Sequence, residues 1–375
     1  MRIGILGGGQ LGRMLALSGY PLGFSFRFLD PSPEACAGQV GELLVGDYRD
    51  EVLLRRFAEG LDVVTYEFEN VPAEAARFLA QSLPVYPPPK ALRVAQDRLV
   101  EKRFFSSLGI PTPAFCTVEG PEDLPPAVER LGLPALLKTR RGGYDGKGQI
   151  PLQTPEDLKP VSETLDGAHL LLEQFVPFDR ELSVVAVRAA SGEVAFYPLV
   201  ENHHREGILR LSLAPAPGLT PELQAKAETY ARRVLEAMGY VGVIAIEFFQ
   251  VGEELLANEM APRVHNSGHW TIEGAQTSQF QNHLRAICGL PLGPTAPRGW
   301  SAMVNLIGRA PDFRRLLAFP QAHLHWYGKQ VRPDRKVGHV TLQADSEDTL
   351  RELLPRLLDL VGERLPGPYR MASSR

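Results

Sequence analysis

The sequence predicts a protein that combines α/β and α+β architecture: an N-terminal doubly wound unit, a larger α+β unit and a small C-terminal module. Strand and helix patterns alternate over the first ~95 residues, which is typical of a doubly wound sheet. Prolines interrupt this pattern at residues 87–89, and leucines at helical spacing lie near the end of the chain. With 375 residues, 44% of them hydrophobic, the chain is long enough for two or three domains with sizeable cores.

The N-terminal unit contains apolar runs of strand length at residues 3–6, 26–29 and 63–66. A glycine turn follows the first run, and the apolar spacing after this turn predicts a helix over residues 11–18. We expect these elements to form a small doubly wound α/β unit.

The larger unit begins after the proline run with a predicted helix over residues 91–108, which carries Arg98 and Lys102. A compact segment of mixed helix and strand then extends to residue 174, and a longer α+β stretch follows it. This stretch contains a predicted helix over residues 222–238, opened by a Thr220-Pro pair.

The C-terminal module begins near Trp300 and ends in a predicted helix with Ser346 as its N-cap and Pro355 as a kink. Its apolar residues recur at helical spacing, and we expect them to pack in a core: Leu350, Leu353, Leu354, Leu357, Leu358 and Val361.

Composition excludes several function classes. A net charge of −4 gives the whole chain no attraction for nucleic acid or for a membrane surface. The three cysteines, Cys36, Cys116 and Cys288, lie far apart, so they indicate neither a zinc site nor a disulfide framework. No stretch approaches the ~20 apolar residues of a membrane span, and the N-terminus lacks the apolar core of an export signal. We therefore expect a cytoplasmic protein.

A glycine-rich segment between Lys138 and Gln149 carries the strongest chemical signal. Gly143, Gly146 and Gly148 allow close approach of backbone amides to an anion, and lysines flank them. Such a segment favours binding of a polyphosphate. The alternative is an ordinary basic hairpin on the surface.

A second signal is a pair of carboxylates on two predicted strands, residues 241–250 and 255–260. If residues 252–254 form a three-residue hairpin loop, Glu247 and Glu259 face each other. Opposed carboxylates require a proton or a cation between them, and oxygen ligands beside a phosphate site suggest magnesium. In a different register both glutamates would be solvated.

The N-terminal glycines satisfy G-x-G-x-x-G at residues 7–12, and Asp30 ends the next strand, as in a dinucleotide-binding enzyme. This motif is weak by itself, because any helix N-terminus that admits a phosphate requires similar glycines. Glu67 and Glu69 follow a strand at the edge where such sheets bind small ligands. We therefore expect residues 7–12 to hold a substrate phosphate or ribose.

Two further segments are rich in polar groups. The stretch after Glu259 contains Arg263, which suits a small planar anion, and the pair His265 and His269, which would suit a metal only on a helix. Residues 329–339 gather four cations, which can clamp a phosphate or form a solvated turn.

Taken together, the motifs resemble the 5-(carboxyamino)imidazole ribonucleotide synthases, a family of ATP-grasp enzymes of purine biosynthesis, nearly from end to end. The motifs that carry the resemblance are Gly7-Gly-Gly-Gln-Leu-Gly-Arg-Met14, Gly143-Tyr-Asp-Gly-Lys-Gly-Gln149, Asn258-Glu-Met-Ala-Pro-Arg-Val-His-Asn-Ser-Gly-His-Trp-Thr271 and His325-Trp-Tyr-Gly-Lys329 with Lys336-Val-Gly-His339. The family's fold implies a Rossmann-like preATP-grasp domain over residues 1–95, an ATP-grasp domain over 96–295 with a mobile lid at about 113–174, and a C-terminal module over 296–375.

The resemblance also implies residue roles. The expected ATP site consists of Arg98, Lys138, Gly143, Tyr144, Asp145, Gly146, Lys147, Gly148, Gln149, Glu173, Gln174, Phe175, Val176, Glu181, His204, Asn258 and Glu259. The expected magnesium ligands are Glu247 and Glu259. The expected ribonucleotide site consists of Gln10, Leu11, Glu67, Lys329, Arg335 and Lys336. The expected catalytic group is Arg263, His265 and Asn266, with Tyr144, Asp145 and Lys147 from the lid.

The reaction implied is ATP-dependent carboxylation of aminoimidazole ribonucleotide with bicarbonate through carboxyphosphate, by a homodimer that uses Mg²⁺ and no nucleic acid or membrane partner. Two departures from the family pattern stand out: Arg141 occupies a position where many relatives have a small residue, and the Asn202-His-His204 sequence leaves open which histidine faces ATP.

Three alternatives remain. They are a related ATP-grasp enzyme that activates formate for glycinamide ribonucleotide, an NAD-dependent oxidoreductase, and a nucleotide-binding protein without catalysis.

Overall fold

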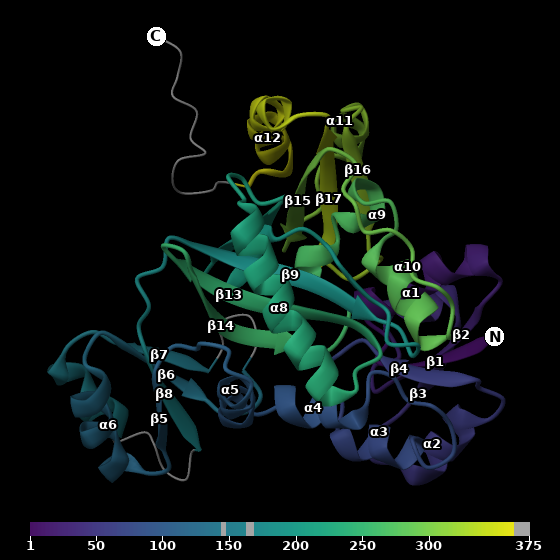
Figure 1. The fold of residues 1–375 in the computed structure, drawn as a ribbon. Helices are drawn as coiled ribbons and strands as arrows, with labels where there is room; N and C mark the ends of the chain where they lie inside the picture. The colour runs from purple at the N-terminus through teal and green to yellow at the C-terminus, as the bar shows by residue number, and fades with distance from the viewer. Residues whose placement is uncertain (144–147, 163–168, 364–375) are drawn as a thin grey trace.

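The computed structural model describes residues 1–143, 148–162 and 169–363, and within them the strands form three sheets (Figure 1). The first sheet is parallel, with the order β3-β2-β1-β4. Its strands are β1 (Arg2–Leu6), β2 (Ser25–Asp30), β3 (Glu42–Val45) and β4 (Val63–Tyr66). Its helices are α1 (Gln10–Gly19), α2 (Glu51–Ala58) and α3 (Ala73–Leu79), with short 3-10 turns η1 (Tyr20–Leu22) and η2 (Cys36–Val40).

These elements confirm the doubly wound N-terminal unit and its three predicted strands. The periodicity of the sequence did not reveal β3, so the strand expected third is the fourth in the chain. The reason is that β3 is a four-residue edge strand with a single buried residue, Leu44. Such a short strand gives almost no periodic signal.

The helix predicted over residues 91–108 is wrong as one element, because it is two helices, α4 (Pro89–Ala95) and α5 (Arg98–Ser107). Asp97 breaks it: its backbone is extended, and its carboxylate accepts hydrogen bonds from the amides of Leu99 and Val100. This is an N-cap that starts a new helix. The break places Arg98 at the first position of α5.

The second sheet is antiparallel, with the order β5-β8-β6-β7, and lies at the lower left of Figure 1. Its strands are β5 (Phe115–Val118), β6 (Ala135–Thr139), β7 (Gln149–Leu152) and β8 (Leu170–Gln174), accompanied by α6 (Leu124–Leu131), α7 (Leu158–Ser162), η3 (Pro121–Asp123) and η4 (Pro155–Asp157). Leu124, Leu137 and Leu172 belong to a small hydrophobic core of its own. A separate core is the physical condition for this segment to act as an independent unit.

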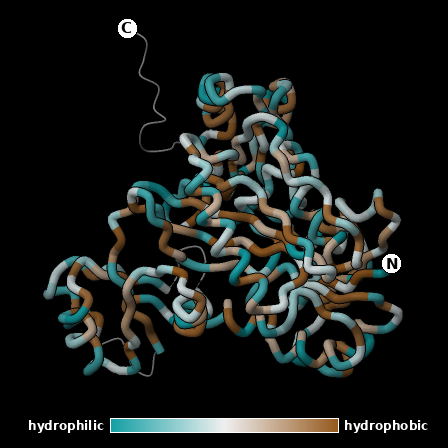
Figure 2. The backbone as a smooth tube through the Cα atoms, in the orientation of Figure 1, coloured by the Kyte–Doolittle hydropathy of each residue, from teal (hydrophilic) through white to brown (hydrophobic). Residues whose placement is uncertain are grey.

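The third sheet has nine strands, and its main path runs β14-β13-β9-β11-β12-β15-β17-β16, with β10 paired to β9. The strands are β9 (Arg180–Arg188), β10 (Val194–Phe196), β11 (Val200–Arg205), β12 (Ile208–Ala214), β13 (Gly242–Val251), β14 (Glu254–Ala261), β15 (Trp300–Ile307), β16 (Ala322–Trp326) and β17 (Lys336–Ala344). Hydrophobic segments run along strands in the middle of the molecule (Figure 2). Because β12 pairs with β15, the C-terminal strands continue the central sheet.

The helices of this part are α8 (Pro221–Met238), α9 (Thr271–Gly274), α10 (Gln279–Ile287), α11 (Phe313–Leu317), α12 (Glu347–Val361) and the turn η5 (Asn266–Gly268). The helix predicted over residues 222–238 is confirmed, with Thr220 as its N-cap and Gly239 in the left-handed conformation at its end. The tail helix α12 is also confirmed, with Ser346 as its N-cap, Pro355 inside it and its leucines in the core.

The hairpin formed by β13 and β14 brings Glu247 opposite Glu259, but by a different route from the one predicted. The loop has two residues, because Val251 pairs with Glu254, and this register alone would not align the two glutamates. A register shift between Glu247 and Phe248 makes Asn258 an extra residue on β14. This β-bulge restores the predicted pair.

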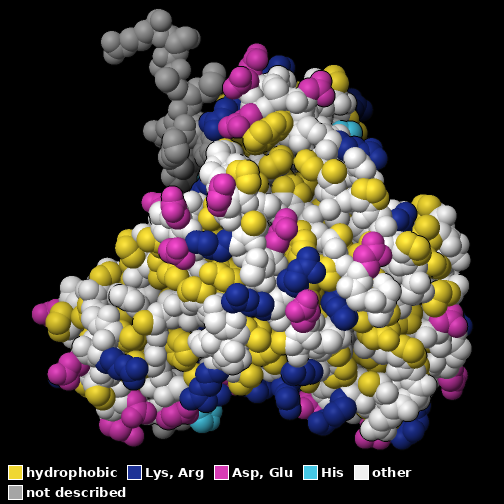
Figure 3. Space-filling model, viewed as in Figure 1, with side chains coloured by type: hydrophobic (Ala, Val, Ile, Leu, Met, Phe, Trp, Pro, Cys, Tyr) yellow, Lys and Arg dark blue, Asp and Glu magenta, His cyan; other side chains and the backbone are white. Residues whose placement is uncertain are grey.

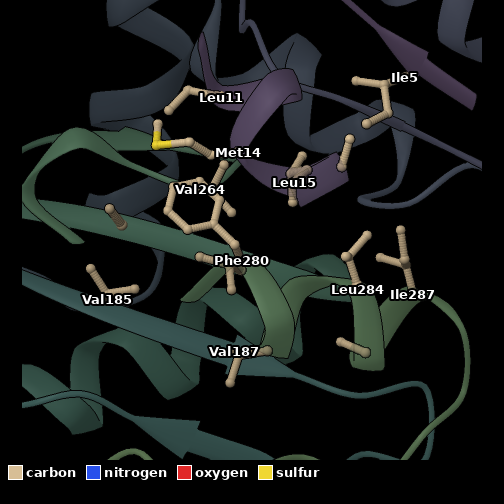
Figure 4. Packing of buried hydrophobic residues seen from close by; sticks show 14 of the residues in the cluster. Ile5, Leu11, Met14, Leu15, Val185, Val187, Val264, Phe280, Leu284 and Ile287 are labelled. Carbon is tan, nitrogen blue, oxygen red and sulfur yellow. The ribbon is translucent and has the colours of Figure 1, made fainter. Parts of the chain in front are cut away.

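The N-terminal and central sheets share one hydrophobic core, in which Leu15 of α1 packs in the same cluster as Phe280 and Leu284 of α10 (Figure 4). One buried polar contact also joins them. His283 of α10 accepts a hydrogen bond at Nδ1 from the Val243 amide (3.0 Å), so Nε2 carries the proton and donates to Thr65 Oγ1 at 2.8 Å. Burial lowers the pKa of His283 to about 3.

We predict that His283→Gln weakens the acid dependence of stability. The folded pKa of His283 lies below its unfolded value of ~6.5, so the unfolded chain binds more protons and stability falls with acid between these two values. Urea unfolding at pH 5 to 6 should give a slope of the unfolding free energy that is smaller by about 1 kcal/mol per pH unit than in the wild type. Thr65→Val, the control, removes the partner hydroxyl without a titrating group and should leave the slope unchanged. Parallel curves for His283→Gln and the wild type would show that His283 does not carry this acid dependence.

Candidate active site

A cavity of about 960 Å³ is lined by residues of the second and third sheets, of α1 and of the segment that follows β4. The predicted site residues in its lining are Gln10, Leu11, Glu67, Arg98, Lys138, Gly143, Gln149, Glu181, His204, Glu247, Asn258, Glu259, Arg263, His265, Asn266, Lys329, Arg335 and Lys336. These residues are spread over more than 300 positions of the chain, so the fold brings the three predicted groups of residues into one space.

Other predicted residues stand apart from this lining. Glu173 is buried behind it, and Gly148, Gln174, Phe175 and Val176 do not line it. Tyr144, Asp145, Gly146 and Lys147 lie outside the described residues.

The two carboxylates Glu247 and Glu259 lie side by side at the bulge, in a crowded acidic setting. Burial and the neighbouring Glu259 raise the pKa of Glu247 to about 8. The same two causes raise the pKa of Glu101, on α5, to about 8. Arg98 Nη1 lies 3.2 Å from Glu259 Oε2 and offsets part of this repulsion. The arrangement favours one more cation or a retained proton.

The residues around this pair fit a magnesium ion. Asn258 Oδ1 is buried beside the glutamates and has no hydrogen-bond partner among the residues that the structure describes. With the two carboxylates it provides a set of oxygen donors, which Mg²⁺ prefers. No cluster of three or more His, Cys, Asp or Glu side chains suited to a metal occurs in the described part of the chain, so the third donor would be an amide oxygen.

Lys138 is held by a buried cluster of charges. Its Nζ lies 2.9 Å from Glu173 Oε2, and Lys102 Nζ lies 3.4 Å from the same oxygen. Burial alone would raise the pKa of Glu173, but the two lysines lower it. The side chain of Glu173 orients Lys138 from behind, while Lys138 lines the cavity. The predicted contact of residues 173–176 with the nucleotide stays a prediction.

The stem of the glycine-rich segment is tied to the start of α5. Arg140 makes two hydrogen bonds to the Asp97 carboxylate, at 3.1 and 2.8 Å, and Arg141 Nε lies 3.3 Å from it. Arg140 also lines the cavity. The unusual Arg141 therefore has a structural partner: it adds charge to the Asp97 cap.

The N-terminal glycine loop is already bound by internal carboxylates. Glu67 accepts hydrogen bonds from the amides of Gly9, Leu11 and Gly12, and Asp30 accepts one from Gly8. These contacts argue against the phosphate half of the expectation, because two carboxylates occupy the positions that an anion would take. The same observation argues against a dinucleotide pyrophosphate at this motif. A ribose at residues 7–12, the other half of the expectation, stays a prediction.

A further part of the cavity lining is cationic. Lys329 Nζ contacts Gln10 Oε1 in a hydrogen bond between residues 319 positions apart, and Arg335 and Lys336 lie beside it in the lining. Burial lowers the pKa of Lys329, although Cys36 and Glu67 oppose this effect. The basic cluster thus faces the cavity, which the sequence alone left open.

Arg263 pairs through its Nε with Glu69, another lining residue. Burial alone would lower the pKa of Arg263, but Glu69 raises it. Asn266 exchanges two hydrogen bonds with Asn305 of β15, at 3.1 and 2.7 Å. Sequence reasoning missed Asn305, since a lone asparagine in an apolar strand carries no specific signal.

The two histidine pairs of the sequence differ in their relation to the cavity. His204 lines the cavity, with Nδ1 2.8 Å from Glu181 Oε2, while His203 pairs with Glu201 outside the lining. Burial would lower the pKa of His204, but Glu181 raises it to about 9. His265 and His269 do not lie on a helix that would pair them: His265 caps η5 and His269 is buried behind it.

Comparisons with known proteins agree with this geometry. Family models match the ribonucleotide synthetase preATP-grasp domain at residues 1–96, the ATP-grasp domain at 103–280 and the phosphoribosylaminoimidazole carboxylase C-terminal domain at 301–353. The chain is 54% identical to N5-carboxyaminoimidazole ribonucleotide synthase of Pseudomonas aeruginosa, covering 96% of this chain and 99% of the relative.

Solved structures agree as well. The crystal structure of N5-carboxyaminoimidazole ribonucleotide synthetase from Thermus thermophilus is 68% identical with a TM-score of 0.94, covering 98% of this chain and all of that one. The Aspergillus clavatus synthase in complex with ADP and 5-aminoimidazole ribonucleotide is 33% identical with a TM-score of 0.89, covering 96% and 98%. This chain therefore belongs to the family of N5-carboxyaminoimidazole ribonucleotide synthases, with the ATP-grasp fold.

Proposed function

We propose that the protein carboxylates 5-aminoimidazole ribonucleotide with bicarbonate at the expense of ATP, giving N5-carboxyaminoimidazole ribonucleotide, ADP and phosphate in purine biosynthesis. The observation that carries this proposal is one cavity whose lining combines an opposed pair of carboxylates beside Arg98 and Lys138 with the cations Lys329, Arg335 and Lys336. The names of the relatives support it, as does the fungal complex with ADP and the ribonucleotide.

In this proposal ATP lies between the second sheet and the central sheet. Arg98 and Lys138 contact its phosphates, the segment from Gly143 to Gln149 closes over them, and adenine lies against the hinge at residues 173–176. His204 and Glu181 bind the nucleotide. The positive charge of Lys138, kept in place by Glu173, supports this assignment because a fixed cation stabilises phosphoryl charge without reorganising.

Glu247, Glu259 and Asn258 would hold Mg²⁺. Bound there, the ion would neutralise charge on the β- and γ-phosphates of ATP. The raised pKa of Glu247 and the unpartnered oxygen of Asn258 support this assignment.

The ribonucleotide would be held by Gln10, Leu11, Glu67, Lys329, Arg335 and Lys336. Lys329, Arg335 and Lys336 provide positive charge for its phosphate. Glu67, with its carboxylate at the helix N-terminus, suits the hydroxyl groups of a ribose, which can donate to it.

The chemistry would take place beside Arg263, His265 and Asn266, with Tyr144, Asp145 and Lys147 expected to approach from the segment outside the described residues. Bicarbonate oxygen attacks the γ-phosphorus and ADP leaves, forming carboxyphosphate. The 5-amine then captures the carboxyl carbon, or CO2 released from it, and phosphate leaves. Carboxyphosphate hydrolyses readily, so the cavity has to exclude water while it exists.

The wider organisation is also proposed. We assign residues 1–95 to a preATP-grasp domain, 96–295 to an ATP-grasp domain with a lid at about 113–174, and 296–375 to a C-terminal module; the matched family models have similar bounds. The resemblance supports a homodimer, and the scattered cysteines support a reducing, cytoplasmic setting. Every helix within the described residues is too short or too polar to cross a membrane. On the face seen in Figure 3, acidic and basic side chains are interspersed.

We predict that purified protein releases phosphate from Mg-ATP and bicarbonate only when 5-aminoimidazole ribonucleotide is added. A phosphate-release assay should compare this pair with formate plus glycinamide ribonucleotide.

Glu259→Gln should abolish release while circular dichroism and the melting temperature stay close to wild type, because it removes the carboxylate that opposes Glu247. Stimulation by formate and glycinamide ribonucleotide would move the protein to the related formate-activating class, and ATP binding without release would indicate a nucleotide sensor.

We further predict that Lys329→Ala raises the KM for the ribonucleotide at least tenfold and the KM for ATP less than about twofold, since one charge-assisted contact contributes ~1.5–3 kcal/mol. Steady-state kinetics with each substrate varied in turn measures both values. Lys90→Ala is a control, because this exposed lysine lies outside the cavity lining. Equal effects of Lys329→Ala on both substrates would show that this lysine is structural.

A further inference from the structure

A chain of buried hydrogen bonds runs from the central sheet to His265. Ser212 Oγ donates to Asn202 Oδ1 at 2.7 Å, and Asn202 Nδ2 donates to Ser183 Oγ at 2.9 Å. Ser183 Oγ lies 2.8 Å from Ser267 Oγ, and Ser267 Oγ lies 2.9 Å from His265 Nδ1. The first four residues are buried, and only the histidine reaches the cavity.

The direction of this chain is fixed by one backbone amide. The N–H of Ser267 points at His265 Nδ1 from 3.3 Å, and an amide can only donate, so Nδ1 is an acceptor. The Ser267 hydroxyl must then also donate to Nδ1, which leaves its oxygen to accept from Ser183. Ser183 in turn accepts from the Asn202 amide group, so every proton in the chain has one position.

We propose that Ser267 and Ser183 are positioning residues that fix His265 as the tautomer protonated at Nε2, with its N–H directed into the cavity. Nε2 lies 3.5 Å from Glu247 Oε1, beside the opposed carboxylates. Gln279 holds the backbone of the same residue by a hydrogen bond from the His265 amide (2.9 Å) and another to its carbonyl (2.6 Å). Both the position and the protonation of the ring are therefore set by buried groups.

The environment of the ring favours the uncharged form. A proton on Nδ1 would face the Ser267 amide, which can only donate, so the geometry disfavours the doubly protonated ring. A neutral ring with Nδ1 already accepting and Nε2 already protonated has no free lone pair facing the cavity. Given the proposed function, His265 then stabilises negative charge on the oxygens of the bicarbonate-derived group as a hydrogen-bond donor, and it does not take the proton of the amine.

The tautomer can be measured directly on the full-length free protein. Long-range ¹H–¹⁵N correlation spectra of ¹⁵N-histidine-labelled protein distinguish the protonated from the unprotonated ring nitrogen, and His265→Gln identifies the signal among the nine histidines. We expect a single species in the wild type, with the proton on Nε2. A proton on Nδ1 would overturn the proposal whether or not any variant folds.

Variants test the positioning. Ser267→Ala removes the shorter hydrogen bond to Nδ1 (2.9 Å) and leaves only the backbone amide at 3.3 Å, so a minor population of the second tautomer should appear. It should also lower kcat about tenfold, with the KM for Mg-ATP within about twofold of wild type. Ser183→Ala should lower kcat less, and the double variant should resemble Ser267→Ala, because Ser183 acts through Ser267. The matched control is Ser301→Ala, a buried serine whose hydroxyl has no partner among the described residues and which should behave as wild type in both assays.

An unchanged tautomer in Ser267→Ala would overturn the positioning role of Ser267, whatever kcat does. A changed tautomer with an unchanged kcat would overturn the role of His265 as a donor. If the wild type released no phosphate with the ribonucleotide, the proposed function would fail, while the spectrum of the wild type would still decide the tautomer.

Discussion

The opposition of Glu247 and Glu259 across β13 and β14 is the constraint on which the rest of the site depends. A β-bulge at Asn258 places the two glutamates opposite each other. The arrangement disfavours the charged form of Glu247, because burial and repulsion by Glu259 raise its pKa to about 8. Two carboxylates in such a position are stable when a cation or a retained proton relieves their repulsion. Two neighbouring groups can relieve the repulsion. Arg98 contacts Glu259, and the side-chain oxygen of Asn258, which has no hydrogen-bond partner among the described residues, is free to bind a cation.

Different segments of the chain each contribute a cation to the cavity that contains this pair. The break at Asp97 directs Arg98 into the site, the second sheet provides Lys138 through the buried Glu173, and the C-terminal strands bring Lys329 against Gln10. The central sheet continues through β15 to β17, so Lys336, at the start of β17, belongs to the same sheet as the two carboxylates. The site therefore depends on contacts between residues that are far apart in the chain.

The sequence predicted helices and strands that depend on local apolar spacing and capping residues. It did not predict features that depend on contacts between distant parts of the chain. Apolar periodicity and capping residues located five strands, β1, β2, β4, β13 and β14, and both long helices. Asp97 was not recognised as a cap inside a helical pattern, and β3 was too short to detect. The pair of Glu247 and Glu259 was right although the loop length was wrong, because a bulge compensates for it. That Glu67 accepts hydrogen bonds from the glycine loop, and that Asn305 and Ser267 contact Asn266 and His265, follows only from the fold.

The most direct test of the central claim is a titration of the Glu247 carboxyl by ¹³C NMR, with Glu247→Gln to identify its signal. The account predicts a midpoint at about 8 in the free protein. It also predicts a lower midpoint in the Glu259→Gln variant and after addition of Mg²⁺ with ADP, because both changes relieve the repulsion. A midpoint near the ordinary glutamate value of about 4.3 in the free protein would show that the two carboxylates do not constrain each other, and would contradict the account.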